Sequence, residues 1–114
     1  MTLNVSQKKV DPDITVIELQ GRLTLGRECQ RVEEMVRQLR SEGVLKLIME
    51  LKELTYIDSA GLGMLAMSAA TLRGAGGDLR ISSPAERVTA ALKLTQLDRI
   101  LPIYQDLEAA CKVF

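Results

Sequence analysis

The chain of 114 residues contains no histidine and no tryptophan, and its only aromatic residues are Tyr56, Tyr104 and Phe114. Without histidine, a Ser-His-Asp catalytic triad cannot be built within this chain. Three aromatic rings leave little surface on which nucleic-acid bases could stack. Lys and Arg together number 15, as do Asp and Glu, so the formal net charge is zero. With no basic field to collect nucleic acid or anionic lipid, we expect neither as a partner.

Cysteine and long apolar runs are also scarce. Cys29 and Cys111 each fall on the apolar stripe of a predicted helix, which is typical of small hydrophobic core residues. Nothing near them supplies further ligands, so we expect no disulfide, no metal and no cofactor. The first residues show no basic stretch followed by an apolar run, and no apolar run approaches the length of a membrane span. These features predict a cytoplasmic protein with one domain over residues 1–114.

The hydrophobic pattern predicts an α/β fold. Runs of apolar and β-branched residues predict strands at residues 2–10, 14–20, 45–51, 79–82 and 100–104. Helical spacing of apolar residues predicts helices at residues 27–41, about 58–74, about 84–94 and 106–114. This order indicates a sandwich in which a mostly parallel sheet of about five strands, with a mixed edge, is flanked by four helices. Right-handed crossovers would gather the strand-to-helix loops at one end, where sites on such sheets usually lie.

The stretch from Thr55 to Gly63 is the least ordinary part of the sequence. Asp58 and Ser59 are both good N-cap residues for the helix that follows. Gly61 and Gly63 then fall in its first turns, although glycine in a helix costs about 1 kcal/mol relative to alanine. Glycine there allows close approach, either of neighbouring segments of this chain or of a partner. The residues alone leave both interpretations open.

These residues resemble a known family. The stretch from Leu51 to Gly63, with Asp58-Ser59-Ala60-Gly61-Leu62-Gly63 at its end, is similar to the STAS domain, and above all to bacterial anti-sigma factor antagonists. The likeness covers nearly the whole chain. It extends to the early turn at Leu19–Leu23, to Gly76–Leu79, and to a late pattern made by Ser83, Pro84, Val88, Leu92, Leu97 and Ile100. We therefore expect a STAS-like fold.

The resemblance implies a partner switch. In the family, the serine after the aspartate is phosphorylated by a partner that is both anti-sigma factor and serine kinase, and Ser59 matches that position. The unphosphorylated protein would bind the anti-sigma factor and free a sigma factor. Phosphorylation would break the complex, and a serine phosphatase would restore it. The partner-binding surface expected around Ser59 consists of Asp58, Ala60, Gly61, Gly63, Met64, Thr24 and Arg27. Met64 could equally be a core residue, and the same two interpretations apply to Met67.

Three positions depart from the family pattern. Thr24 stands in the early turn where antagonists commonly carry an acidic residue. Glu50 stands where many members have Asp or Asn at the end of the central strand, and Ala60 where a second serine is frequent. Thr24 lies close to where the family's partner docks, so it is either a polar contact of the interface or a plain turn residue.

Other function classes are weaker matches to the sequence. Residues 57–61 lack the leading glycine of a nucleophile elbow, and the glycine-rich turn at 74–77 follows a helix instead of a strand. We therefore do not expect an enzyme. Two alternatives use the same surface. One is a STAS scaffold or subunit that is not phosphorylated, in a stressosome-like or transport complex. The other is a module that senses a small ligand or nucleotide through an anion held at residues 58–63.

Overall fold

The computed structural model describes residues 3–114, so Thr2, expected to begin the first strand, lies outside the described residues. The described strands are β1 (Leu3–Asp11), β2 (Ile14–Leu23), β3 (Lys46–Glu50), β4 (Leu54–Ile57), β5 (Asp78–Ser82) and β6 (Ile103–Tyr104). The helices are α1 (Arg27–Ser41), α2 (Ser59–Gly74), α3 (Glu86–Leu94) and α4 (Leu107–Cys111). Helix α1 has the bounds that its apolar spacing predicts.

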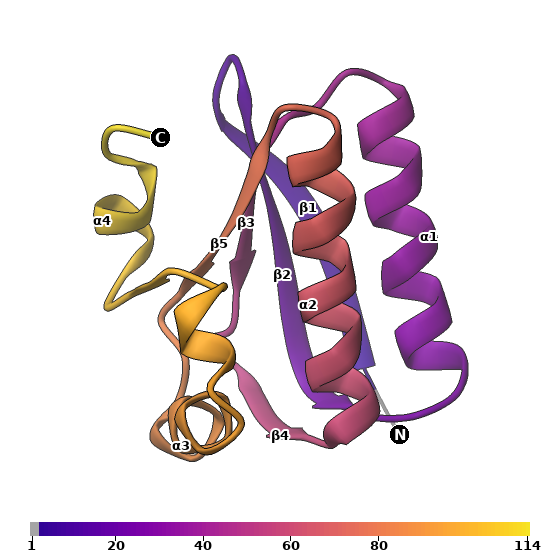
Figure 1. Cartoon of the computed structure of the whole chain (residues 1–114), viewed down its shortest axis with the longest axis vertical. Helices are drawn as coiled ribbons and strands as arrows, with labels where there is room; N and C mark the ends of the chain where they lie inside the picture. Colours follow the sequence, from indigo (N-terminus) through magenta and orange to yellow (C-terminus); the bar gives the residue numbers. More distant parts are fainter. Residues whose placement is uncertain (1–2) are drawn as a thin grey trace.

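The sheet is mostly parallel, as the sequence predicts. β1 and β2 form an antiparallel hairpin at one edge, and β2, β3, β5 and β6 follow in that order with parallel pairing. β2 pairs with β3 through Glu18, and its last residues, Gly21–Leu23, then pair in parallel with β4. Because β2 leads to α1 and β4 leads to α2, this pairing places the starts of both helices at the same end of the sheet (Figure 1).

The structure differs from the predicted elements in several places. β2 continues to Leu23, through the segment expected to form a turn, and α3 begins at Glu86, two residues later than predicted. β4 is additional to the five predicted strands, because it is four residues long and only its ends, Leu54 and Ile57, are buried, without the alternation that marks a strand. The predicted strand at residues 100–104 shrinks to Ile103–Tyr104, because a 3₁₀ turn occupies Leu97–Arg99 just before it. The predicted helix at residues 106–114 ends at Cys111, because Lys112 is extended and Val113 has a φ of +49°.

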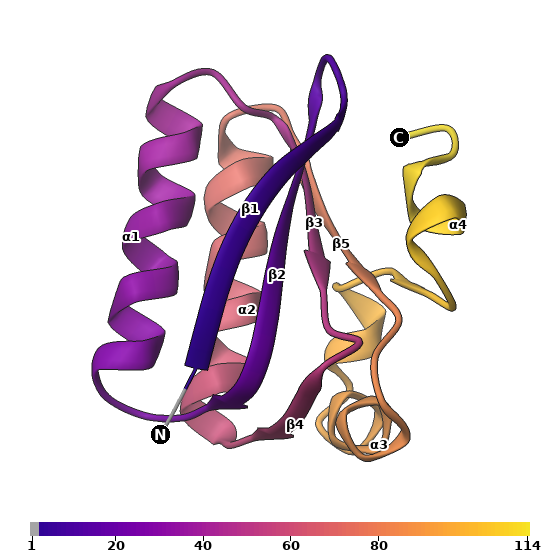
Figure 2. The same ribbon diagram turned by 180° about the vertical axis from the view of Figure 1, so that it is seen from behind.

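The two faces of the sheet bury separate apolar clusters. α1 and α2 lie side by side on one face, and α4 lies on the other (Figures 1 and 2). The larger cluster, on the α1–α2 face, includes Ile17, Leu47, Met49, Leu79 and Ile81. The smaller cluster, on the rear face under α4, consists of Ile14, Val16, Ile48 and Ala110. The alternation along β2 and β3 therefore assigns neighbouring residues to different faces.

The two cysteines lie where their apolar spacing predicts. Cys29 is buried on α1 in the larger cluster, and the half-buried Cys111 packs against the smaller one. Burial raises the pKa of both thiols above the ordinary value, and the nearby Asp58 carboxylate raises the pKa of Cys29 further. Both thiols are therefore protonated at neutral pH. Within residues 3–114, no helix combines the length and the apolar character that a bilayer span requires.

Gly77 lies directly against the backbone of another connection. A Cβ atom added there would lie 2.1 Å from the Leu45 carbonyl oxygen, and the Asp78 N–H donates to that same oxygen at 2.8 Å. The α2–β5 and α1–β3 connections therefore touch through backbone atoms, and only glycine fits between them. Gly74, three residues earlier at the end of α2, faces open space.

We expect Gly77→Ala to destabilise the protein by about 3 kcal/mol, at the upper end of the range for overpacking, because backbone cannot yield as a flexible side chain can. The matched control is Gly74→Ala, which should be neutral or stabilising by up to about 1 kcal/mol. Urea unfolding of the two variants measures this difference. Equal stabilities would show that the contact between Gly77 and Leu45 does not constrain the fold.

Candidate partner-binding site

The motif around Ser59 lies where β4 passes into α2. Asp58 is the N-cap residue of α2, in an extended conformation with φ −102° and ψ −177°. Ser59 is the first helical residue, and it is exposed. The last residues of β2 and the loop that leads from β2 to α1 flank this point. The structure thus brings the early turn near Thr24 and the Ser59 motif together, as the sequence predicts.

The Asp58 carboxylate joins two segments that are far apart in sequence. Its Oδ1 accepts a hydrogen bond from the Gly61 N–H at 2.8 Å, which caps α2. Its Oδ2 accepts from the Leu25 N–H at 2.9 Å, in the β2–α1 loop. The Asp58 N–H in turn donates to the Leu23 carbonyl at 3.2 Å. One side chain therefore fixes both the start of α2 and the neighbouring loop.

These contacts also set the charge of Asp58. The N–H groups of Gly61 and Leu25 hold the pKa of the Asp58 carboxyl below its ordinary value, because hydrogen bonds to the charged form favour ionisation. Partial burial opposes this effect and is the smaller influence on the pKa. Asp58 is therefore ionised at neutral pH and accepts both hydrogen bonds at full strength.

The two glycines of the motif have different roles. A Cβ atom on Gly61 would lie 2.7 Å from the Leu23 carbonyl oxygen and 2.8 Å from Ile57 Cγ1. Gly61 is buried and is required by packing of α2 on β2, so the expectation that a partner approaches it is wrong. Gly63 is exposed, and a Cβ atom there would meet nothing within 4 Å. The packing of this chain therefore gives no reason for the glycine at position 63.

The other expected contact residues also divide into residues at the surface and residues in the core. Arg27 is exposed, and Thr24 and Ala60 are half-buried. Thr24 precedes Leu25, whose N–H donates to Asp58, and Ala60 is two residues after Asp58. Met64 is wrong as a surface residue, because its exposed fraction is 3% and its sulfur accepts a hydrogen bond from the Ser68 hydroxyl inside the core. A helix turn of 3.6 residues directs position 64 inward when positions 59 and 63 face solvent.

Two exposed apolar residues are missing from the expected set of contact residues. Leu25 is 79% exposed, and its backbone is held by Asp58; Met67 is 63% exposed on α2. Ser59, Gly63 and Met67 follow each other at intervals of four residues, so they share one side of α2. A large apolar residue in a short loop, and the four-residue spacing from Ser59, were the available signals. We refer to Leu25, Ser59, Gly63 and Met67 as the Ser59 face.

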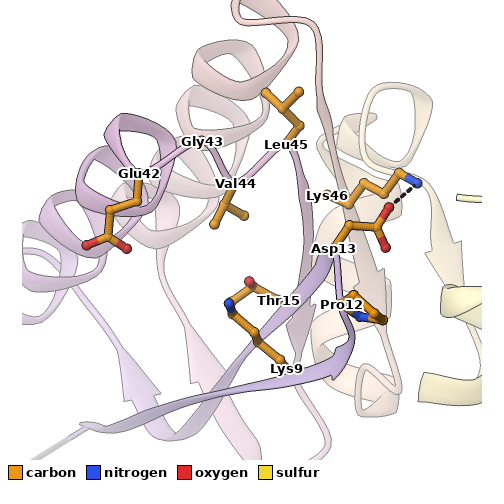
Figure 3. Close-up of a pocket in the computed structure, with 9 residues that line it drawn as sticks. All are labelled: Lys9, Pro12, Asp13, Thr15, Glu42, Gly43, Val44, Leu45 and Lys46. Atoms are coloured by element: carbon orange, nitrogen blue, oxygen red, sulfur yellow. Dashed lines mark hydrogen bonds and ion pairs between the residues drawn. The ribbon is translucent and has the colours of Figure 1, made fainter.

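A hollow of about 310 Å³ lies at the other end of the sheet, between the β1–β2 turn and the α1–β3 connection (Figure 3). Its polar groups do not converge. Lys46 pairs with Asp13 at 2.8 Å, and both point away from the buried Thr15 (Figure 3). Over the described part of the chain, no group of three or more Cys, Asp or Glu side chains could hold a metal ion.

Known proteins share this architecture. A sequence profile of the STAS domain matches residues 6–110. A Thermotoga neapolitana protein named as a candidate anti-sigma factor antagonist, a homologue of TM1081, is 34% identical over 70 residues, which is 61% of this chain and 62% of that protein. The match thus spans less than two-thirds of that relative.

Solved structures extend the likeness over almost the whole fold. The crystal structure of the Thermotoga maritima protein TM1081, also a candidate anti-sigma factor antagonist, has a TM-score of 0.85 at 28% identity and covers 93% of this chain and 90% of its own. Bacillus SpoIIAA, an anti-sigma factor antagonist, has a TM-score of 0.75 unphosphorylated, at 19% identity, and covers 96% of this chain and 97% of its own. Its phosphorylated form scores 0.76 at 18% identity, over 97% and 100%.

Together, the fold and the site define a small α/β domain with an exposed serine at a capped helix start. The chain belongs to the STAS domain family. The sequence resemblance to this family is therefore confirmed, as is the STAS-like fold.

The lowered pKa of Asp58 gives a prediction with a definite sign. A carboxyl whose pKa is lower in the folded state stabilises the protein fully above its unfolded pKa, and loses this contribution as the pH falls through the folded value. Asp58→Asn keeps the side-chain shape and an N-cap acceptor but cannot ionise. We expect the wild-type protein to exceed this variant in unfolding free energy at neutral pH, and by much less near pH 2.

Urea titrations of both proteins over this pH range measure the difference. The Asp106→Asn variant is a matched control, because Asp106 caps α4 through the Ala109 N–H alone and joins no second loop. If the difference in unfolding free energy between wild type and Asp58→Asn stays constant with pH, Asp58 is not an ionised residue that accepts two hydrogen bonds, and the assignment is contradicted.

Proposed function

We propose that this protein is an anti-sigma factor antagonist that acts in the bacterial cytoplasm. In its unphosphorylated form it binds an anti-sigma factor with serine kinase activity, and so frees a sigma factor. The kinase transfers a phosphoryl group to the Ser59 hydroxyl, the complex dissociates, and a serine phosphatase restores the binding form. The observation that carries this proposal is the exposure of Ser59 as the first residue of α2, beside the firmly held Asp58. The relatives named as antagonists support the partner class.

The position of Ser59 explains why the fold can accept a phosphate. A phosphoserine carries about −1.5 to −2 charges at neutral pH. At the start of a helix this charge meets the positive end of the helix dipole and N–H groups that lack intrahelical acceptors. The similar TM-scores to the two forms of SpoIIAA are consistent with one fold for both states. The modification therefore acts on binding without a change of fold.

The surroundings of Ser59 explain why a partner would be released. Leu25 and Met67 are exposed apolar residues on the Ser59 face. Apolar side chains of this kind form the centre of many protein interfaces, where water is excluded. A phosphate dianion placed there would lose part of its hydration to the apolar interface, which is unfavourable. Asp58, next to Ser59, is already ionised. An acidic partner group that faces Asp58 would therefore be repelled by both the carboxylate and the phosphate.

Ser59→Asp should fold with wild-type stability and bind the anti-sigma factor at least tenfold more weakly, because a carboxylate imitates part of the phosphate charge. Ser41→Asp is the matched control, since Ser41 is exposed at the end of α1 remote from the start of α2 (Figure 1). It should bind normally. Isothermal titration with the anti-sigma factor that binds the wild-type protein gives the affinities. Wild-type affinity of Ser59→Asp would refute local charge control.

Gly63→Ala separates the needs of the fold from those of the partner. The added methyl group meets open space, so the variant should be more stable by up to about 1 kcal/mol. If a partner's backbone packs closely on the Ser59 face, the same methyl group should weaken binding by roughly tenfold, as overpacking does in a core. Gly74→Ala, in open space at the far end of α2, should leave binding unchanged. Unchanged affinity of Gly63→Ala would remove Gly63 from the interface.

The direct test of the proposal uses phosphoryl transfer. The protein is incubated with ATP, Mg²⁺ and kinase-type anti-sigma factors from the same genome, and its intact mass is then measured. We expect addition of one phosphate that maps to Ser59 and is absent in Ser59→Ala. Stable binding of such a partner without any phosphate transfer would instead favour a STAS scaffold that is not phosphorylated. If no such partner binds, the proposed function is wrong.

A further inference from the structure

The rear face of the sheet has a cover of its own. Residues 107–114, which we call the strap, comprise α4 and the three residues after it. The strap lies on the side of the sheet away from α1 and α2 (Figures 1 and 2). Leu107, Cys111 and Phe114 are partly buried against Ile14, Val16 and Ile48, which are themselves 4% exposed or less. This cluster is separate from the larger core, so the strap can be considered apart from it.

Arg80 fastens the strap to the sheet. It lies on β5 opposite Ile48 of β3, so its side chain is on the rear face. Its Nη1 donates to the carbonyls of Ala110 at 2.8 Å and Lys112 at 2.7 Å, and its Nη2 donates to the Val113 carbonyl at 2.8 Å. The guanidinium carbon lies 4.2 Å from the Phe114 ring centroid and 5.0 Å from that of Tyr104. One guanidinium thus contacts three backbone carbonyls and one aromatic ring within the last five residues of the strap.

The strap has little structure that would persist without this pin. α4 has five residues, far below the length at which an isolated helix is stable in water. Val113 has a φ of +49°, a left-handed conformation that is unfavourable for a β-branched residue, and its side chain is 97% exposed. Packing does not compensate this strain at Val113. The hydrogen bonds from Arg80 to the Lys112 and Val113 carbonyls, together with the packing of Phe114, hold this turn.

Opening the strap would leave no uncompensated charge. The acceptors on Arg80 are neutral backbone carbonyls, and an opened strap would expose both them and the guanidinium to water. The β-ladder of β2, β3 and β5 uses none of these hydrogen bonds. The loss is limited to one small apolar cluster and one arginine, whereas unfolding the sheet would expose the larger core. A segment that buries so little opens locally at a lower free-energy cost than unfolding of the whole domain.

We propose that residues 107–114 form a releasable strap, pinned by Arg80, whose opening uncovers Ile14, Val16 and Ile48 while the sheet and the α1–α2 face remain folded. Val16 and Ile48 are directly paired on neighbouring strands, with Ile14 two residues away on the same face. Release of the strap therefore exposes an apolar surface at the rear of the sheet, which the strap covers when it is closed. This device is independent of Ser59, which lies at the start of α2.

Hydrogen–deuterium exchange of the full chain, followed by mass spectrometry, tests the strap. In the wild-type protein, the peptide that contains residues 107–114 should exchange faster than the peptide that contains β3. Arg80→Lys keeps the positive charge but loses the forked donor geometry and the ring contacts. We expect it to accelerate exchange of the strap at least tenfold and to leave β3 unchanged. Arg22→Lys is the matched control, because Arg22 lies 4.3 Å from the Tyr56 ring centroid but does not contact the strap.

The two cysteines provide a second readout in the same variants. Cys111 is on the strap and Cys29 is in the larger core, so iodoacetamide modification reports the opening of each. Arg80→Lys should accelerate modification of Cys111 and leave that of Cys29 unchanged. If Arg80→Lys leaves both strap readouts unchanged, Arg80 is not the pin. If the strap and β3 become accessible together, or Arg80→Lys unfolds the sheet, the strap is part of the cooperative core and the proposal is wrong.

Discussion

The Asp58 carboxylate is the constraint on which the site depends. Its two oxygens accept from the N–H groups of Gly61 and Leu25, which belong to a helix start and to a loop more than thirty positions earlier in the chain. The same two hydrogen bonds lower the pKa of Asp58, so the residue is ionised at neutral pH while it accepts them. Ser59, one residue later, is therefore displayed from a fixed backbone and does not itself need to hold the loop. A rigid frame beside an exposed hydroxyl is what a phosphorylation switch without a change of fold requires.

The glycines show how stability and binding share this short motif. Gly61 lies against the Leu23 carbonyl and the Ile57 side chain, so α2 could not pack on β2 with any larger residue there. Gly63 has open space instead, and a helix without a binding role would be more stable with alanine. One glycine thus serves the fold, and the packing of this chain does not require the other. The exposed Leu25 and Met67 on that face support the same interpretation, because folding does not bury them.

The sequence predicts most of the fold and the centre of the site, for identifiable reasons. The apolar spacing of Cys29, Val32, Val36 and Leu39 sets the bounds of α1, and the continuous apolar run of β3 indicates a central strand. The capping role of Asp58 follows from local chemistry, which depends on few neighbours, whereas Ser59 is nominated by the resemblance of its motif to the STAS family. The rest depends on tertiary contacts. The pairing of β4 with the end of β2, the packing of Gly61 and the inward direction of Met64 are set by segments distant in sequence. Arg80 holds carbonyls about thirty residues away, and no local pattern indicates this.

The central claim is that phosphate on Ser59 acts locally, on a frame that Asp58 keeps fixed. The most direct measurement is a comparison of amide hydrogen exchange at Leu25 and Gly61, by nuclear magnetic resonance, in the Ser59-phosphorylated and unmodified proteins. Our account predicts that both amides keep their protection after phosphorylation, because both hydrogen bonds to Asp58 persist. Loss of protection at either amide would show that the phosphate releases the loop or the helix start, and would contradict the account.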